Sequence, residues 1–364
     1  MTPTPARRSD APALPLVAPP RHICILRLSA LGDTCHVVPI IRTLQDAWPS
    51  VQLTWIIGKS EARLMQLLPD VELISVDKRS AWSAQRTLRA VLRNRHFDVL
   101  LHMQLALRAS LLARLVSASI KLGFDRARAR ELQWLFTNAQ IAPRTHEHVL
   151  DSFFGFAAAL GVRQRILRWE LPLPQAALAY AQRLIPDARP TLLISPCSSH
   201  PLRNWQPERY AALADYAIRV HGMRVILVGG PTEIERRVSA EILSRVAAKA
   251  QILDQVGKDT LPELLALLGR ARVLVAPDSG PVHMATMVGT PVIGLYAATN
   301  PARSGPYLSR RWCIDAYPTA ARQFCHAEAA SLPWTRKIER PGVMDLITIG
   351  QVTAKLDELL RYGA

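Results

Sequence analysis

Short apolar runs alternate with amphipathic segments along the N-terminal part of the chain. The sequence predicts strands where Val, Ile and Leu cluster between turn residues, and helices where apolar positions recur every three or four residues. The predicted strands lie at 22–28, 51–57, 71–76 and 97–103, and the predicted helices at 35–48, 60–68 and 81–95. Strands that alternate with helices are typical of a parallel sheet covered by helices.

The same alternation restarts after a proline-containing break at 171–174. Predicted strands follow at 191–195, 223–228, 251–253, 273–276 and 292–296, with helices at 175–184, 261–268 and 349–362. We therefore predict an α/β protein with two doubly wound, Rossmann-like domains that face each other across a cleft. The expected segments are a disordered tail at 1–20, domains at 21–172 and 190–348, a linker at 173–189 and a terminal helix at 349–364.

Composition places the chain among soluble globular proteins, with 49% hydrophobic and 20% charged residues. The 45 Lys and Arg residues against 29 Asp and Glu give a formal net charge of +16. This excess indicates an acidic partner, such as nucleic acid, an anionic membrane surface or a phosphorylated substrate. Aromatic residues make up only 6% of the chain, and no nucleic-acid-binding module is recognisable, so we expect no nucleic-acid partner.

The cysteine pattern and the apolar segments bear on location. Five cysteines are scattered without a CxxC pair, which indicates a reducing compartment and no metal site. The prolines within residues 1–20 interrupt the apolar core that a signal peptide needs, and no later apolar stretch approaches the roughly 20 residues that span a bilayer. We expect a cytoplasmic protein that contacts a membrane only at its surface.

The stretch 273–296 combines strand, turn and helix signals in a compact βαβ pattern. Pro281 suits the first helical position, Asp278 to Gly280 supply capping and turn chemistry, and Gly289 suits a left-handed helix end. A turn at Gly280 can also require a φ angle that only glycine tolerates. The start of this helix would direct free N–H groups at a phosphate. The alternative is that Asp278 only caps the helix and His283 is an interior histidine.

Other polar residues follow predicted strands of the second domain. Ser198, Ser199 and Arg203 come after the strand at 191–195, and Glu233 follows the Gly-Gly turn after the strand at 223–228. Hydroxyls and an arginine can hold a diphosphate, and a carboxylate can accept hydrogen bonds from ribose. Alternatively, the two serines only form turns, Arg203 is a solvated surface charge, and Glu233 is an acid that the helix dipole favours in a first turn.

Asp33 stands at a strand-to-helix turn of the first domain. A carboxylate at that edge can act as general base towards a hydroxyl group. The alternative is that Asp33 caps the helix after Gly32.

Four motifs together resemble the ADP-heptose:lipopolysaccharide heptosyltransferases of glycosyltransferase family 9. They are LSALGD at 28–33, RNW followed by PERY at 203–210, GGPTE at 229–233 and PDSGPVHMA at 277–285. The resemblance spans about residues 21–350. It implies a GT-B fold, a nucleotide-sugar donor held mainly by the second domain, and metal-independent transfer with inversion at the anomeric carbon.

Carried over by position, the resemblance makes Asp33 the catalytic base and Arg203, often lysine in relatives, the residue that holds the donor diphosphate. Glu233 would bind the ribose. The remaining donor-site positions are Ser198, Ser199, Asp278, Ser279, Gly280 and His283. No cofactor and no metal ion are expected.

The resemblance also implies the partners: ADP-heptose as donor, an anionic lipopolysaccharide inner core as acceptor, and peripheral contact with the cytoplasmic face of the inner membrane. An arginine-rich first domain would suit such an acceptor. The arginines concerned are Arg63, Arg79, Arg86, Arg89, Arg126, Arg128 and Arg130. Two other interpretations remain open, a family relative with another acceptor and a basic, non-catalytic nucleotide- or nucleic-acid-binding protein.

Overall fold

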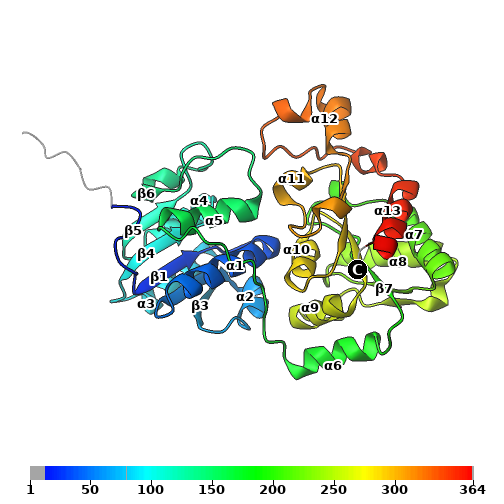
Figure 1. Cartoon of the computed structure of the whole chain (residues 1–364), viewed down its shortest axis with the longest axis horizontal. Coiled ribbons are helices and arrows are strands. Elements are labelled where there is room, and N and C mark those ends of the chain that lie inside the picture. Colours follow the sequence, from blue (N-terminus) through cyan, green and yellow to red (C-terminus); the bar gives the residue numbers. More distant parts are fainter. Residues whose placement is uncertain (1–12, 79, 363–364) are drawn as a thin grey trace, which may run out of the picture. The chain divides into compact units, whose positions relative to one another are not determined.

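The computed structural model describes residues 13–78 and 80–362, so residues 1–12 of the predicted tail and Arg79 lie outside the described residues. The chain forms two compact units. The first comprises the described residues through Ser29, Val37–Arg144 and Asp151–Arg168, and the second comprises Ala30–His36, Thr145–Leu150 and the described chain from Trp169 onward. Each unit contains a parallel sheet of six strands with helices packed against it (Figure 1).

The sheet of the first unit has the strand order β3-β2-β1-β4-β5-β6. Its strands are β1 His22–Leu26, β2 Gln52–Gly58, β3 Val71–Val76, β4 Phe97–His102, β5 Ala118–Gly123 and β6 Ala139–Gln140. The helices of this part of the chain are α1 Leu31–Ala47, α2 Lys59–Met65, α3 Ala81–Val91, α4 Leu107–Ala113 and α5 Val149–Ala159. In the register of the central strands, Ile25 lies beside Trp55 on β2 and Leu101 on β4.

Helices α3 and α4 cover the same face of this sheet. Their inward residues share one buried apolar cluster with residues of β1 and β4. Among its members are Ala84, Leu88, Ala109, Leu112, Cys24, Leu26 and Leu100. The opposite sides of both helices therefore face away from the sheet.

The sheet of the second unit has the order β12-β11-β10-β7-β8-β9. Its strands are β7 Thr191–Ile194, β8 Arg224–Leu227, β9 Ile252–Asp254, β10 Val273–Pro277, β11 Val292–Tyr296 and β12 Ile314–Asp315. The helices are α6 Gln175–Leu184, α7 Pro207–His221, α8 Glu233–Arg245, α9 Leu261–Arg270, α10 Gly280–Met287, α11 Pro301–Ser304, α12 Tyr317–Cys325 and α13 Ile349–Tyr362. Short 3-10 helices lie at Gln133–Leu135, Pro201–Arg203, Lys249–Gln251, Arg310–Trp312, Ala329–Ser331 and Val343–Leu346.

The last helix, α13, completes the core of the second unit. Val352, Leu356 and Leu359 are fully buried in the same cluster as Trp205 and Tyr210. In Figure 1, α13 lies beside α7 in this unit. The Trp205 indole N–H also donates to the Ile347 carbonyl oxygen at 2.8 Å. The amphipathic pattern that predicted a packed terminal helix is thus confirmed.

Both sheets follow the same doubly wound order. Counted within each unit, the strand order is 3-2-1-4-5-6, and the order reverses between β1 and β4 and between β7 and β10. The predicted α/β class with two doubly wound sheets is confirmed. In such sheets ligands bind at the carboxyl ends of the strands where the order reverses. In the second unit this position lies at the ends of β7 and β10.

The structure departs from the predicted elements at the start of α1 and in segments for which no element was predicted, which include α7, α11, β12 and α12. Helix α1 begins at Leu31, four residues earlier than the predicted start at residue 35, because the Asp33 carboxylate accepts a hydrogen bond from the Ala30 N–H and so caps the first turn. No element was predicted between 104 and 170, where the structure has α4, β5, β6 and α5. Within the described ranges, each helix is too short or too polar to cross a membrane.

Candidate active site at the carboxyl edge of the second sheet

Two loops meet where the strand order of the second sheet reverses. The Ser198 hydroxyl, in the loop after β7, donates to the Asp278 carbonyl oxygen after β10 at 2.6 Å. The Ser198 N–H donates to the Asn204 side-chain oxygen at 2.7 Å, which holds the loop in this conformation. Ser199 is exposed beside it. The structure therefore brings together Ser198 and Asp278, while Ser199 lies at the rim.

Arg203 is the best-anchored cation at this edge. Its side chain is only 11% exposed, and its Nε and Nη2 atoms donate to Glu339 Oε1 at 2.8 and 2.6 Å. Its Nη1 atom lies 3.8 Å from Asp278 Oδ2. Partial burial acts to raise the pKa of Glu339, but the hydrogen bonds and charge of Arg203 outweigh it and hold that pKa below its ordinary value. Both members of the pair are therefore charged at neutral pH.

Further charged residues extend this cluster from a segment near the C-terminus. The Ile338 N–H donates to the Ala298 carbonyl oxygen at 2.8 Å, which places residues 337–339 beside the chain that leaves β11. Partial burial and the charge of Arg203 lower the pKa of Lys337, and Arg303 acts in the same direction. The carboxylates of Glu339 and Asp278 act against this shift. Lys337 therefore lies within electrostatic range of Arg203, Arg303 and both carboxylates.

Sequence reasoning missed Lys337, Glu339 and Arg303. They lie far along the chain from the strand ends that carry the recognised motifs. The alternation of polar Lys337 and Glu339 with buried Ile338 was the available signal, since it is the pattern of an extended, half-buried segment.

Helix α10 begins beside this cluster. Ser279 is its N-cap, in an extended conformation, and the Ser279 Oγ atom is buried without a hydrogen-bond partner among the described residues. The first N–H groups of a helix have no partner within the helix. A buried hydroxyl and free N–H groups together form a site for an anion.

Two details of this turn differ from the prediction, and one agrees. Gly280 rather than Pro281 opens the helix, so Pro281 occupies the second helical position. Gly280 is absent from the positive-φ glycines of the described chain, so the prediction of a φ angle restricted to glycine is wrong there. What distinguishes Gly280 is space, because a Cβ atom would lie 3.2 Å from Leu31 Cδ2. Gly289, by contrast, has φ +75°, as predicted for the helix end.

His283 lies one turn into α10 with a buried ring. Its Nδ1 atom has no hydrogen-bond partner within the described residues, and its ring centroid lies 4.6 Å from that of His36. Burial lowers the pKa of His283, although the carboxylates of Asp278 and Asp33 oppose the shift. The imidazole is therefore neutral at physiological pH and keeps unused hydrogen-bonding capacity.

Asp33 belongs, with residues 30–36, to the same contact unit as α10. Its carboxylate is partly exposed and accepts from the Ala30 N–H at 3.4 Å, so the capping alternative is observed. At the neighbouring residue, Gly32, a Cβ atom would lie 2.3 Å from His283 Cδ2. The start of α1 can approach α10 this closely only because residue 32 lacks a side chain.

Glu233 and Glu235 follow the Gly-Gly turn after β8 and point in different directions. Glu235, not Glu233, turns back, because its carboxylate accepts from the Gly230 N–H at 2.8 Å and from the Thr232 hydroxyl at 2.6 Å. Glu233 is exposed at the first position of α8. Among the described residues, no group of three or more His, Cys, Asp or Glu residues is arranged to hold a metal ion.

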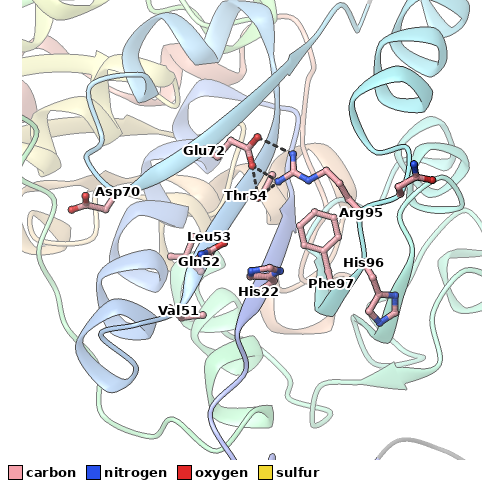
Figure 2. A pocket seen from close by; sticks show the side chains of 11 residues that line it. His22, Val51, Gln52, Leu53, Thr54, Asp70, Glu72, Arg95, His96 and Phe97 are labelled. Atoms are coloured by element: carbon pink, nitrogen blue, oxygen red, sulfur yellow. Dashed lines mark hydrogen bonds and ion pairs between the residues drawn. The ribbon is translucent and has the colours of Figure 1, made fainter.

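A pocket of about 560 Å³ lies elsewhere, at the amino ends of β1 to β4 in the first unit (Figure 2). There Arg95 donates to both carboxylate oxygens of Glu72, at 2.8 and 2.5 Å, and the Thr54 hydroxyl donates to the same carboxylate at 2.8 Å. The hydrogen bond from Arg95 lowers the pKa of Glu72, so the pair is ionised and mutually neutralised. Because ligands of such sheets bind at the carboxyl ends of strands, we interpret this pocket as structural.

Comparisons with known proteins identify the family and the fold of the chain. Residues 85–331 match the sequence family described as glycosyltransferase family 9 (heptosyltransferase). The chain is 38% identical over 342 residues to the lipopolysaccharide core heptosyltransferase OpsX of Haemophilus influenzae, covering 93% of this chain and 97% of that protein.

Solved structures of similar fold include a glycosyl transferase family 9 protein from Veillonella parvula, with 23% identity and a TM-score of 0.76, over 94% of this chain and 97% of the other. The E. coli heptosyltransferase WaaC with ADP is 21% identical with a TM-score of 0.69, over 93% and 99% of the two chains. These matches support the fold that the sequence motifs imply.

Proposed function

Because the chain belongs to glycosyltransferase family 9, we propose that it transfers heptose from ADP-heptose to a hydroxyl group of the lipopolysaccharide inner core. Membership of the family makes it a glycosyltransferase. We take the donor and the acceptor from the names of its relatives, above all the lipopolysaccharide core heptosyltransferase that is 38% identical over 342 residues. The observation in this chain that carries the proposal is the anchored cation beside the start of α10, at the point where the strand order reverses.

In this proposal the donor binds residues 190–348 and the acceptor residues 21–172. The donor diphosphate lies at the start of α10, where the Ser279 hydroxyl and the N–H groups that follow Gly280 can donate to it. Arg203 and Lys337 supply positive charge, and Glu339 fixes the orientation of Arg203 through two hydrogen bonds. Glu233, exposed at the first position of α8, accepts hydrogen bonds from the ribose hydroxyls.

The chemical step is an inverting displacement. The acceptor oxygen attacks the anomeric carbon, the bond from that carbon to the diphosphate oxygen breaks, and ADP leaves with the bonding electrons. Asp33 accepts the proton of the acceptor hydroxyl as the new bond forms. Asp33 belongs to the same compact unit as α10, so in this proposal one unit carries both the base and the donor phosphate site.

Charge compensation for the leaving group comes from protein groups in this proposal. A nucleoside diphosphate gains negative charge as the glycosidic bond breaks, and preorganised donors stabilise it without reorganising. Arg203, Lys337 and the start of α10 provide those donors. His283 stays neutral because of its burial and donates or accepts a hydrogen bond without adding charge. No metal ion is then required.

We place this reaction at the cytoplasmic face of the inner membrane, where an anionic lipid-linked acceptor is available. Two arginines of the first unit are already engaged, since Arg128 pairs with Asp125 and Arg126 lies 3.8 Å over the Trp134 ring. Exposed arginines such as Arg86 and Arg89 remain to face anionic groups.

The proposal is tested by incubating the purified protein with ADP-heptose and lipopolysaccharide from a heptose-deficient strain. We expect release of ADP and a mass increase of the acceptor by one heptosyl residue. Acceptor that already carries its core heptoses is the matched control and should gain no mass. Binding of ADP without any transfer to the heptose-deficient acceptor would contradict the proposed acceptor.

A further inference from the structure

The outward sides of α3 and α4 form an exposed surface on the first unit. Since both helices bury their inner residues against the same sheet face, their outer stripes lie together on the molecule's exterior. We define the α3–α4 face by its exposed residues. They are Trp82, Arg86, Arg89, Val91, Arg93, Leu107, Arg108, Leu111 and Arg114.

The α3–α4 face exposes large apolar side chains. Trp82 is 70% exposed, and Val91, Leu107 and Leu111 are each about 40% exposed. Trp82, Arg86 and Arg89 follow the spacing of one stripe of α3, and Arg93 lies in the turn after the helix. The Arg86 guanidinium lies 5.5 Å from the centroid of the Trp82 ring. An indole that is mostly in water, next to aliphatic side chains, indicates a surface that is covered in use.

The charged side chains that define this face are all positive, and one acidic group lies at its edge, where the exposed Glu131 carboxylate accepts from the Leu107 N–H at 2.5 Å. The sequence contains no Asp or Glu between residues 78 and 97 or between residues 99 and 124. The intervening Asp98 is engaged at the amino edge of the sheet, where it accepts from the Arg21 and His22 N–H groups at 2.6 and 2.9 Å.

Apolar and basic groups in the same stripe select among acidic partners. A nucleic acid would match the arginines but would press its phosphates against Val91, Leu107 and Leu111. An anionic bilayer matches both, because arginine binds the headgroups while Trp and Leu enter the interface. We propose that the α3–α4 face docks the protein on an anionic phospholipid surface. This extends the membrane contact proposed above by naming its surface.

The test measures binding to sedimenting vesicles of phosphatidylcholine alone or mixed with phosphatidylglycerol. The variant R86A/R89A/R93A removes three charges from the face, and the matched control R237A/R245A/R322A removes three from exposed positions of the second unit. We expect the first variant to lower partition onto mixed vesicles by on the order of 100-fold, and the control to lower it far less. Trp82→Ala should lower it by about tenfold through lost apolar burial.

Raising the salt concentration towards 1 M should remove most binding, since the screening length falls to about 3 Å. Equal binding by the two triple variants, equal binding to both vesicle types, or no binding of the wild-type protein would overturn the proposal. Preferential capture of a polynucleotide instead of mixed vesicles would also overturn it.

The readout does not depend on heptose transfer. Each variant is first checked for an unchanged melting temperature and unchanged ADP affinity, because the substituted side chains are exposed. Vesicle binding without transferase activity would leave this inference standing and contradict the proposed function. Transfer without vesicle binding would do the reverse.

Discussion

Replacing Arg203 by alanine tests the donor site most directly. The guanidinium donates to Glu339 at 2.8 and 2.6 Å and lies 3.8 Å from Asp278, with N–H groups left over for a diphosphate. Loss of a charge-assisted contact costs about 1.5 to 3 kcal/mol, which corresponds to about 10- to 150-fold in affinity. We therefore expect Arg203→Ala to weaken ADP binding by at least tenfold.

A second contribution arises from the carboxylates that Arg203 neutralises. Without the guanidinium, Glu339 and Asp278 face the diphosphate uncompensated, and a carboxylate about 6 Å from a phosphate charge is repelled by roughly 3 kcal/mol at an effective dielectric constant of about 20. Partial exposure of both carboxylates reduces this figure. The double variant R203A/E339Q should therefore bind ADP about tenfold more tightly than Arg203→Ala alone, with the gain limited by screening.

Calorimetric titration with ADP measures both effects, with thermal unfolding as the control for folding. Arg203→Lys should fall between wild type and Arg203→Ala, since it keeps the charge and loses the second hydrogen bond to Glu339. Unchanged ADP affinity in Arg203→Ala would show that the nucleotide binds elsewhere. A double variant no better than the single one would refute the account of the neutralised carboxylates.

Four further outcomes are expected. Asp33→Asn should lower kcat by about 100-fold or more and leave ADP affinity unchanged, because the amide still caps α1 but accepts no proton. Near-normal turnover of this variant would remove Asp33 from the mechanism. Gly280→Val should weaken ADP binding strongly and lower the melting temperature little, since the new side chain meets Leu31 and the phosphate position. Gly289→Ala should lower the melting temperature and leave ADP binding unchanged, because residue 289 has φ +75°. Turnover should survive EDTA, and loss of activity restored by Mg²⁺ would contradict charge compensation by protein groups. Burial raises the pKa of Asp259 to about 7, so wild-type stability is lost as pH rises from about 4 through 7. Between pH 4 and pH 8 the unfolding free energy of Asp259→Asn should therefore rise by about 4 kcal/mol relative to that of the wild type. Urea unfolding that gives the same difference between the two proteins at both pH values would contradict this.

The parts of the fold that the sequence predicted are those with strong local patterns. Strands β7, β10 and β11 are continuous apolar runs bounded by turn residues, and the structure buries every one of their residues. The missed strands β5 and β6 lack such a pattern, since β5 alternates with a lysine and β6 has only two residues. β5 is positioned by pairing with β4, and β6 by pairing with β5, and local periodicity does not encode such pairing.

The candidate site was also predictable only where local sequence patterns define it. Its place after a predicted strand singled out Ser198, and the motif at 277–285 contains Asp278 and Ser279; the fold brings all three to one edge of the sheet. Pattern alone did not decide which glutamate of the turn at 229–235 folds back, because that depends on the direction of the first turn of α8. The pairing of Glu339 with Arg203 was not predictable for another reason, since Arg203 lies 136 residues earlier in the chain.

The partner of Arg203 explains why an arginine suits this position better than a lysine would. A lysine has a single nitrogen, so an ion pair with Glu339 would compete with the donor phosphate for the same atom. The guanidinium uses its Nε edge and one Nη2 hydrogen for Glu339 and still directs Nη1 past Asp278. Anchoring and phosphate binding then involve different hydrogens of one rigid plane. Glu339 and Arg203 therefore act as a unit, and substituting lysine at 203 should be better tolerated when residue 339 is uncharged.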